Sequence, residues 1–260
     1  MRIDAHTHIW EGQEAGIPRM IAEMDKCGID RAVVLPIEGL AGNEFVARCV
    51  KSFPDRLVGF ASVRPHGETV NRGEVRYSDP IDNLNYAIEE LGLRGLKLHP
   101  GIQAFYPNSP ELSPLMATAC KLGIPVLFHT GPSFGRASRV EFAMLHHFDD
   151  LAIAFPELRI ILAHAEIVYI GPMLALKHPN VYLETSWSWK HFSSFMPGIG
   201  KAALKICESK KVIFGTDANP EKAYRFAEEL RVIEELDVPD EDKNRILGAN
   251  MMRVLGEPLP

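Results

Sequence analysis

Short apolar runs alternate with amphipathic stretches along the whole chain. Eight of these runs are rich in Val, Ile, Leu and Phe, which is typical of parallel strands that are covered by helices on both faces. Between them, apolar residues recur at spacings of three and four, as in helices with one buried face. The pattern predicts strands at 2–8, 31–37, 57–64, 93–99, 124–129, 159–164, 180–186 and 211–217, and helices at 17–28, 42–53, 80–91, 111–122, 138–154, 170–177, 198–209 and 220–236.

The regular alternation of strand and helix predicts the fold class. It implies right-handed βαβ units in a parallel sheet, and eight repeats favour closure of that sheet into a barrel. The length of 260 residues is close to the ~250 residues typical of a (β/α)8 barrel. No Gly-x-Gly-x-x-Gly motif follows a predicted strand, which argues against an open dinucleotide-binding sheet. We therefore predict one α/β domain over residues 1–260, folded as a (β/α)8 TIM barrel.

The chain continues beyond the eighth predicted helix. Pro239 is followed by three acidic residues, which is typical of a helix start because the acids face the positive end of the helix dipole. The mainly apolar segment 246–256 comes next. We expect this region to form a C-terminal helix packed under the barrel.

The composition and net charge argue against several classes of protein. Hydrophobic residues make up 46% of the chain and charged residues 24%, as in ordinary globular enzymes, and no stretch is apolar for long enough to span a bilayer. A net charge of −6 without a dense run of Lys or Arg argues against binding to nucleic acid or an anionic membrane. The first residues enter a strand directly, unlike a signal peptide. We expect a cytoplasmic protein that acts on a small molecule, and the sequence leaves open whether it forms a homo-oligomer.

Ligand-type and titratable residues gather at one end of the predicted strands. In a (β/α)8 barrel the carboxyl ends of the strands form the active site. Five of the eight predicted strands end in such residues, and scattered core histidines would not all fall at the same end. These residues are His6 and His8 on the first strand, Lys97 and His99 on the fourth, His129 on the fifth, His164 on the sixth and Asp217 on the eighth.

Four of these residues suit a zinc site. Side chains two positions apart on a strand project from the same face, so His6 and His8 can reach one metal ion. Catalytic Zn²⁺ takes three or four nitrogen or oxygen ligands and keeps one position for water or substrate. We predict one Zn²⁺ bound by His6, His8, His129 and Asp217. We also predict that His164 and Asp217 are catalytic, because both are placed to handle protons beside the ion.

The order of these motifs resembles that of a known family. DAHTH on the first predicted strand, a His at the end of the fifth, AHAE on the sixth and FGTDAN on the eighth are similar to motifs of the amidohydrolase superfamily. More closely, the chain resembles the amidohydrolase-related branch that includes aminocarboxymuconate-semialdehyde decarboxylase, and the likeness extends to the closing segment ILGANMMRVLG. The resemblance implies a divalent metal ion, usually Zn²⁺, at His6, His8, His129 and Asp217. It also implies that His164 is the catalytic histidine.

The fourth predicted strand departs from the two-metal members of that superfamily. It has no glutamate at its end, so a second metal ion is not favoured. Lys97 lies where some members carry a carboxylated lysine, but we expect it to hold a substrate carboxylate or to shape the site. Two acidic residues are also expected to face inward. Asp4 would support the ligands, and Glu184 would pair with Lys97 or Arg64.

Three further residues are expected to contact the substrate. His99 ends the same predicted strand as Lys97. Arg136 follows the fifth strand and Trp187 follows the seventh, so both would lie at the mouth of the barrel. An arginine there can pair with an acid group, and an aromatic ring can contact a planar one. These residues favour a substrate that is both planar and acidic.

The predicted site allows three functions. The leading hypothesis is a metal-dependent hydrolase, in which a zinc-activated water attacks the carbonyl of an amide, ester or lactone in a small acidic molecule. The alternative is a non-oxidative decarboxylase of a small carboxylic acid, with His164 helping to protonate the carbon that loses CO2. The third is a barrel that binds a metal ion or ligand without turnover. The additional histidine His164 argues against this third function, because binding alone does not require it.

Overall fold

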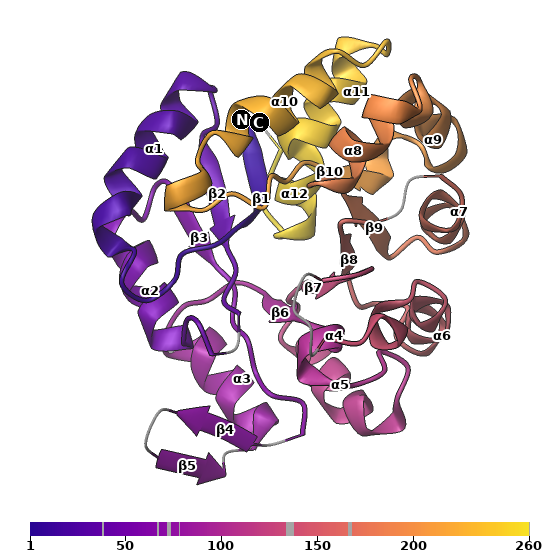
Figure 1. Ribbon diagram of the computed structural model, residues 1–260. Helices are drawn as coiled ribbons and strands as arrows, with labels where there is room; N and C mark the ends of the chain where they lie inside the picture. Colours follow the sequence, from indigo (N-terminus) through magenta and orange to yellow (C-terminus); the bar gives the residue numbers. More distant parts are fainter. Residues whose placement is uncertain are drawn as a thin grey trace.

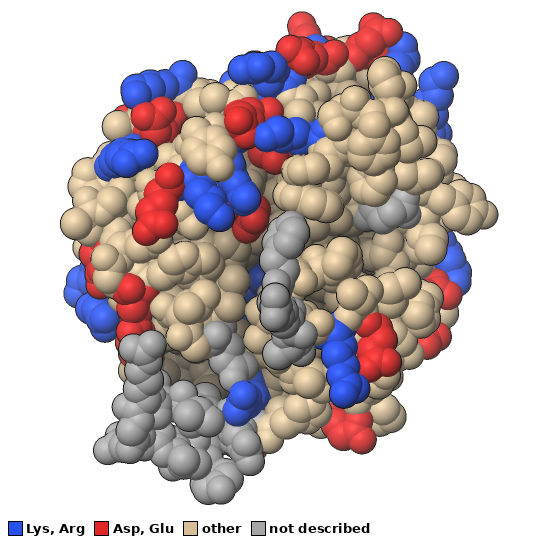
Figure 2. Space-filling model, in the orientation of Figure 1, with Lys and Arg blue, Asp and Glu red and all other residues tan. Residues whose placement is uncertain are grey.

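The structure, a computed structural model, describes residues 1–37, 39–66, 68–71, 74–77, 79–133, 138–165 and 168–259, without the side chains of 68–71 and 74–77. Figure 1 shows a ring of strands surrounded by helices. Within the described ranges, no helix is both long enough and apolar enough to cross a membrane. On the face shown in Figure 2, the acidic and basic side chains are intermixed over the described surface.

Eight parallel strands of the described chain form the ring. Hydrogen bonds order them as β1-β2-β3 and as β10-β9-β8-β7-β6. Bridges from Ala61 to Leu96 and from Thr7 to Ala218 join the two runs. The barrel is therefore closed, and the predicted fold class is confirmed. The strands are β1 (Ile3–Thr7), β2 (Arg31–Val34), β3 (Leu57–Gly59), β6 (Leu96–Leu98), β7 (Val126–His129), β8 (Ile160–Ala163), β9 (Val181–Glu184) and β10 (Val212–Ile213).

Helices connect successive strands and cover the outside of the barrel (Figure 1). They alternate with the strands as the apolar spacing predicts, because each helix buries one face against the strands. The helices are α1 (Ile17–Lys26), α2 (Asn43–Ser52), α3 (Pro80–Glu89), α4 (Pro100–Gln103), α5 (Ser113–Lys121), α6 (His147–Ala154), α7 (Ile170–Lys177), α8 (Ser188–Phe195), α9 (Ile199–Cys207), α10 (Arg225–Glu234), α11 (Asp240–Asn244) and α12 (Asn250–Val254).

Three segments differ from the sequence-based expectation. An antiparallel hairpin, β4 (Glu68–Asn71) and β5 (Glu74–Tyr77), lies between β3 and α3, where the sequence pattern predicts no strand. The single helix expected at 138–154 is divided into a 3-10 turn (Val140–Ala143) and α6. The segment after β9 is expected to be a loop, but it forms α8. The fully buried indole of Trp189 explains this difference, since tertiary packing outweighs local propensity.

Two hydrophobic layers stabilise the barrel. The larger one lies between the strands and the surrounding helices, and the smaller one fills the barrel interior. The interior layer includes Leu127 and Ile161 from the strands, Phe60 directly after β3, and Met251 and Leu255 from the C-terminal region. The C-terminal segment therefore plugs the barrel, as the sequence predicts.

The C-terminal plug is anchored through backbone contacts. A π-helical turn (Arg245–Ala249) precedes α12, and its Ile246 carbonyl accepts a 3.0 Å hydrogen bond from the Phe214 amide. A Cβ atom at Gly248 would overlap the Met1 carbonyl oxygen, so only glycine permits this close approach. The side-chain amide of Asn250 donates to the Ser209 and Val212 carbonyls at 2.7 Å each.

Replacement of Met251 by Ala should leave a cavity in the plugged end of the barrel, because this side chain is fully buried. We expect a loss of about 2–5 kcal/mol in the free energy of unfolding, measured by urea denaturation. Met173→Ala is the matched control, since Met173 is 41% exposed on α7 and its loss should change stability by less than about 0.5 kcal/mol. Equal effects of the two substitutions would contradict the assignment of Met251 to the core.

Candidate metal centre and active site

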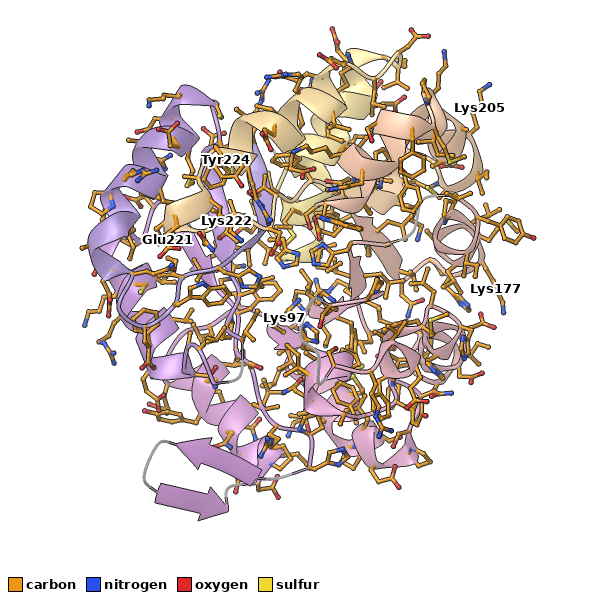
Figure 3. The ribbon with its side chains drawn as sticks, in the orientation of Figure 1. Lys97, Lys177, Lys205, Glu221, Lys222 and Tyr224 are labelled. Carbon is orange, nitrogen blue, oxygen red and sulfur yellow. The ribbon has the colours of Figure 1, made fainter. Side chains whose placement is uncertain are left out.

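A cavity of about 600 Å³ opens at the carboxyl ends of the strands. Its polar lining consists mainly of residues predicted from strand ends, and Ile37, Leu145 and Phe192 contribute apolar walls. Figure 3 places Lys97 at the centre of the ring of strands, where side chains from several strands converge. The predicted residues that line the cavity are His8, Lys97, His99, His129, His164, Trp187 and Asp217.

The first-strand histidines and Asp217 bring three potential ligand atoms together. Nε2 of His6 lies 3.1 Å from Nε2 of His8, and Oδ1 of Asp217 lies 3.7 Å and 3.1 Å from these two nitrogens. Ligands that lie about 2.0–2.2 Å from a tetrahedral zinc ion are about 3.3–3.6 Å apart. The three atoms are therefore spaced as ligands of one ion would be. Among the described residues, ligand atoms of His6, His164 and Asp217 also lie within 4.8 Å of one another.

The protons of both histidines are fixed on the opposite side of their rings. Nδ1 of His8 lies 2.8 Å from the Leu35 carbonyl oxygen, which can only accept a hydrogen bond. Nδ1 of His6 lies 2.8 Å from Oε2 of Glu184. With the hydrogen on Nδ1 in each ring, both Nε2 lone pairs face each other and face Asp217. Three electron-rich atoms in contact need a cation between them, so the geometry fits a bound metal ion.

Strand β1 is irregular where it carries these histidines. Its pairing register with β2 shifts between Asp4 and Thr7, and Ala5 belongs to the interior hydrophobic cluster. The expectation that Asp4, His6 and His8 project together by simple alternation is therefore wrong for Asp4. A bulge of this kind commonly redirects side chains beside active sites.

Asp4 ties β1 to the segment that carries Asp217. Its carboxylate accepts hydrogen bonds from Thr216 Oγ1 at 2.6 Å and from the His6 amide at 2.8 Å. Complete burial raises the pKa of Asp4 to about 8, although these hydrogen bonds oppose the rise. Asp4 thus supports the predicted ligands from a position behind them.

The Asp217 carboxylate is oriented by a cation that the sequence does not reveal. Arg225 on α10 donates to Asp217 Oδ2 at 2.5 Å and to the Asp217 carbonyl at 2.6 Å. Burial alone would raise the pKa of Asp217, but its close contacts with the His8 and His6 rings hold it well below its usual range. Asp217 is therefore an ionised carboxylate.

Three site residues adopt left-handed backbone conformations. The φ angles are 57° at His164, 60° at Trp187 and 54° at Asp217. Such angles are uncommon for residues other than glycine and cluster at functional sites, where surrounding contacts maintain them. All three residues directly follow or closely follow barrel strands, and all three line the cavity.

His129 and His99 form a stacked pair beside the His6–Asp217 cluster. Their ring centroids are 3.8 Å apart, and the His129 ring lies 4.9 Å from that of His164. Nδ1 of His99 accepts from the Ile102 amide at 3.2 Å, which orients this ring. Nε2 of His129 is buried and has no hydrogen-bond partner among the described residues. An unpartnered buried nitrogen fits a residue reserved for a ligand.

Glu184 joins His6 to His164. Its Oε2 contacts His6 Nδ1 at 2.8 Å and accepts from Ser186 Oγ at 2.8 Å, and Ser186 Oγ lies 2.8 Å from His164 Nδ1. The expected pairing of Glu184 with Lys97 or Arg64 is therefore replaced by hydrogen bonds to neighbours at the strand ends. Burial raises the pKa of Glu184, while His164 and the Ser186 hydrogen bonds oppose the rise.

Lys97 presents a buried ammonium group to the cavity. The residue is 2% exposed, and Nζ has no hydrogen-bond partner in the described part of the chain. Burial lowers the pKa of Lys97 to about 8, although Asp217 and Glu184 act in the opposite direction. A buried cation that lines a cavity without a hydrogen bond suits an anionic group of a bound molecule.

The predicted substrate contacts at the cavity mouth are only partly described. The backbone amide of Trp187 donates to Glu229 Oε1 at 3.3 Å, and the indole stacks on His191 at 4.2 Å. Arg136 lies outside the described residues, so its expected role stays a prediction. Sequence reasoning missed Ser186 and Arg225. The spacing of Ser186 two positions after Glu184 was a usable signal, and so was the position of Arg225 eight residues after Asp217.

Comparisons with known proteins find similarity along nearly the whole chain. A family model described as Amidohydrolase matches residues 3–256. A 2-keto-4-carboxy-3-hexenedioate hydratase from Sphingobium sp. (strain NBRC 103272 / SYK-6) is 25% identical over 275 residues, covering 91% of this chain and 76% of the relative.

Two solved structures share the fold. A 5-carboxyvanillate decarboxylase from Sphingomonas paucimobilis has a TM-score of 0.72 and 15% identity, with 99% of each chain covered. A dihydroxybenzoic acid decarboxylase from Polaromonas sp. JS666, solved with bound manganese and an inhibitor, has a TM-score of 0.69 and 18% identity, covering 98% of this chain and 96% of that one.

Replacement of His6 by Ala should abolish stoichiometric metal binding, because it removes the nitrogen that faces both His8 and Asp217. We expect the zinc content, measured by inductively coupled plasma mass spectrometry, to fall from about one ion per chain to a small fraction of that. His66→Ala is the control, since His66 is exposed and should leave the metal content unchanged. Full zinc occupancy in the His6→Ala protein would contradict the assigned site.

Proposed function

Because the chain belongs to the amidohydrolase family, we propose that it is a metal-dependent carboxy-lyase that removes CO2 from a small carboxylic acid. The observation that carries this proposal is the buried, unpartnered Nζ of Lys97 in the cavity wall beside the His6–Asp217 cluster of the described chain. A carboxylate of the substrate is the natural counter-ion for such a group. The activity named for the two decarboxylases that share the fold supports the same reaction class.

A divalent ion, which we propose to be Zn²⁺, would be held by His6, His8, His129 and Asp217. When bound, the ion supplies positive charge that polarises substrate oxygens and stabilises negative charge that develops on them. Glu184 and the Leu35 carbonyl hold the two first-strand imidazoles with Nε2 facing the site. These contacts keep the donor atoms in place before any ligand arrives.

The residues of the chain account for the remaining steps. Lys97 binds and orients the substrate carboxylate, and the apolar wall of Ile37, Leu145 and Phe192 excludes water from the body of the substrate. His164 is half-buried at the cavity, and desolvation lowers its pKa to about 4, which favours the neutral imidazole. We assign to its Nε2 the transfer of a proton, taken from a substrate hydroxyl or from water, to the carbon from which CO2 departs.

A second candidate is the addition of water to a double bond. It is favoured by the hydratase relative, which matches 91% of this chain. The same residues suffice, since Lys97 would hold a carboxylate and His164 would take a proton from water. Hydrolysis of an amide, ester or lactone, the leading hypothesis from the sequence, has less support because these named relatives are decarboxylases and a hydratase.

Product analysis separates these reactions. The metal-loaded protein should release CO2 from members of a panel of hydroxylated benzoic acids and unsaturated dicarboxylic and tricarboxylic acids. Incubation in H2¹⁸O with mass spectrometry of the product distinguishes decarboxylation, with no ¹⁸O gained at carbon, from hydration or hydrolysis. Incorporation of ¹⁸O without release of CO2 would reject the carboxy-lyase proposal.

The role of Lys97 is tested by Lys97→Met, which keeps the length of the side chain and removes its charge. Loss of a charge-assisted hydrogen bond should raise KM for the acid substrate about 10- to 100-fold. Lys177→Met is the control, because Lys177 pairs with Asp149 on the outer surface and should leave kcat and KM unchanged. An unaltered KM in the Lys97→Met protein would show that the substrate carboxylate binds elsewhere.

A further inference from the structure

We propose that Ser186 and Glu184 are positioning residues that fix a hydrogen on Nδ1 of His164, so that Nε2 is the nitrogen that exchanges a proton with the substrate. The inference deepens the proposed function, on which it depends for the catalytic role of His164. Ser186 and Glu184 are both fully buried, and neither lines the cavity. They act on the reaction only through His164 and His6.

The surroundings of His164 Nδ1 favour a donor at that position. Nδ1 lies 2.8 Å from Ser186 Oγ and 3.2 Å from the Ser186 carbonyl oxygen. A carbonyl oxygen can only accept a hydrogen bond, so a lone pair on Nδ1 would face another lone pair. A hydrogen on Nδ1 removes this repulsion and can be shared as a hydrogen bond with both oxygens.

The hydroxyl hydrogen of Ser186 is required elsewhere. Ser186 Oγ also lies 2.8 Å from Oε2 of Glu184, and a hydroxyl group has only one hydrogen to donate. If that hydrogen pointed to His164, the lone pairs of the hydroxyl and of the carboxylate would face each other at 2.8 Å. When Ser186 donates to Glu184 and His164 donates to Ser186, each of these three side chains has a hydrogen-bond partner of the right kind.

The Glu184 carboxylate is itself held by the backbone. Its Oε1 accepts from the Ser186 amide at 2.5 Å, and its Oε2 accepts from the His164 amide at 3.3 Å. A Cβ atom at position 215 would overlap Oε1, so Gly215 leaves the space that this carboxylate occupies. Because backbone N–H groups only donate, both carboxylate oxygens of Glu184 act as acceptors. This keeps the hydrogen bonds running in one direction, from His164 through Ser186 to Glu184.

One carboxylate oxygen therefore determines which ring nitrogen carries the hydrogen in two imidazoles. Oε2 of Glu184 accepts from His6 Nδ1 directly and sets His164 Nδ1 through the Ser186 hydroxyl. The two rings lie 4.7 Å apart between centroids. This arrangement orients a predicted metal ligand and the proton-transfer residue together.

Ser186→Ala tests the inference, because it removes the hydroxyl and keeps the contact of Glu184 with His6. We expect the zinc content to stay unchanged, kcat to fall about 10- to 100-fold and KM to change less than about twofold. Ser186→Thr retains the hydroxyl and should recover most of kcat. Ser209→Ala is the matched control, since it removes a buried serine hydrogen bond, to Asp242 at 2.6 Å, far from the cavity and should leave kcat unaltered.

A spectroscopic measurement decides the position of the hydrogen without reference to turnover. In zinc-loaded protein labelled with ¹⁵N-histidine, the resonances of His164, assigned by their loss in His164→Asn, should show a protonated Nδ1 and an unprotonated Nε2. In Ser186→Ala the resonances should shift toward a mixture of the two tautomers. A protonated Nε2 in the wild-type protein, or a Ser186→Ala protein with wild-type kcat, would overturn the proposal.

The two proposals fail in different ways. If no acid in the panel is converted by the wild-type protein, the proposed function fails, while the nitrogen resonances of wild type and Ser186→Ala still decide where the hydrogen lies. If the acids are converted but the His164 tautomer is the same in both proteins, the positioning role fails and the proposed function stands.

Discussion

The site depends on three electron-rich atoms that the fold holds in contact. Nε2 of His6, Nε2 of His8 and Oδ1 of Asp217 lie 3.1–3.7 Å from one another, and each histidine keeps its hydrogen on the far side of the ring. Such an arrangement is unfavourable without a cation, because lone pairs repel and their burial removes the screening of water. A divalent ion bound between these atoms would replace their mutual repulsion with attraction to the cation.

The barrel supplies the rigidity that this arrangement requires. Asp4, Glu184 and Thr216 are fully buried polar residues that hold the strand ends through hydrogen bonds. Left-handed backbone at His164 and Asp217 adds strain of the order of 1–3 kcal/mol at each residue. The two hydrophobic layers and the C-terminal plug offset these unfavourable terms, so the strained geometry persists in the absence of a substrate.

The polar and the apolar residues that line the cavity together determine which chemistry suits the site. Lys97 offers a positive charge in the cavity wall, while Ile37, Leu145 and Phe192 reduce the polarity around the substrate. Low polarity strengthens the attraction between a carboxylate and its partners. It also favours the departure of CO2, because that product is neutral whereas the carboxylate is charged. Decarboxylation, and addition of water next to a carboxylate, both suit such a site.

The sequence by itself determined the fold class and placed His6 and His164 in one site, because periodicity is a local property and the carboxyl ends of parallel strands meet at one face. Only the tertiary structure decided which groups touch. The bulge in β1 separates Asp4 from the alternation that the sequence implies, and Glu184 contacts His6 across 178 positions of sequence. Arg225 lies at the start of α10, only eight positions after Asp217, and the course of the backbone between them brings its guanidinium group to the Asp217 carboxylate. Hydrogen-bond partners and left-handed backbone arise from the packing of distant segments, which is why they emerge only in the folded chain.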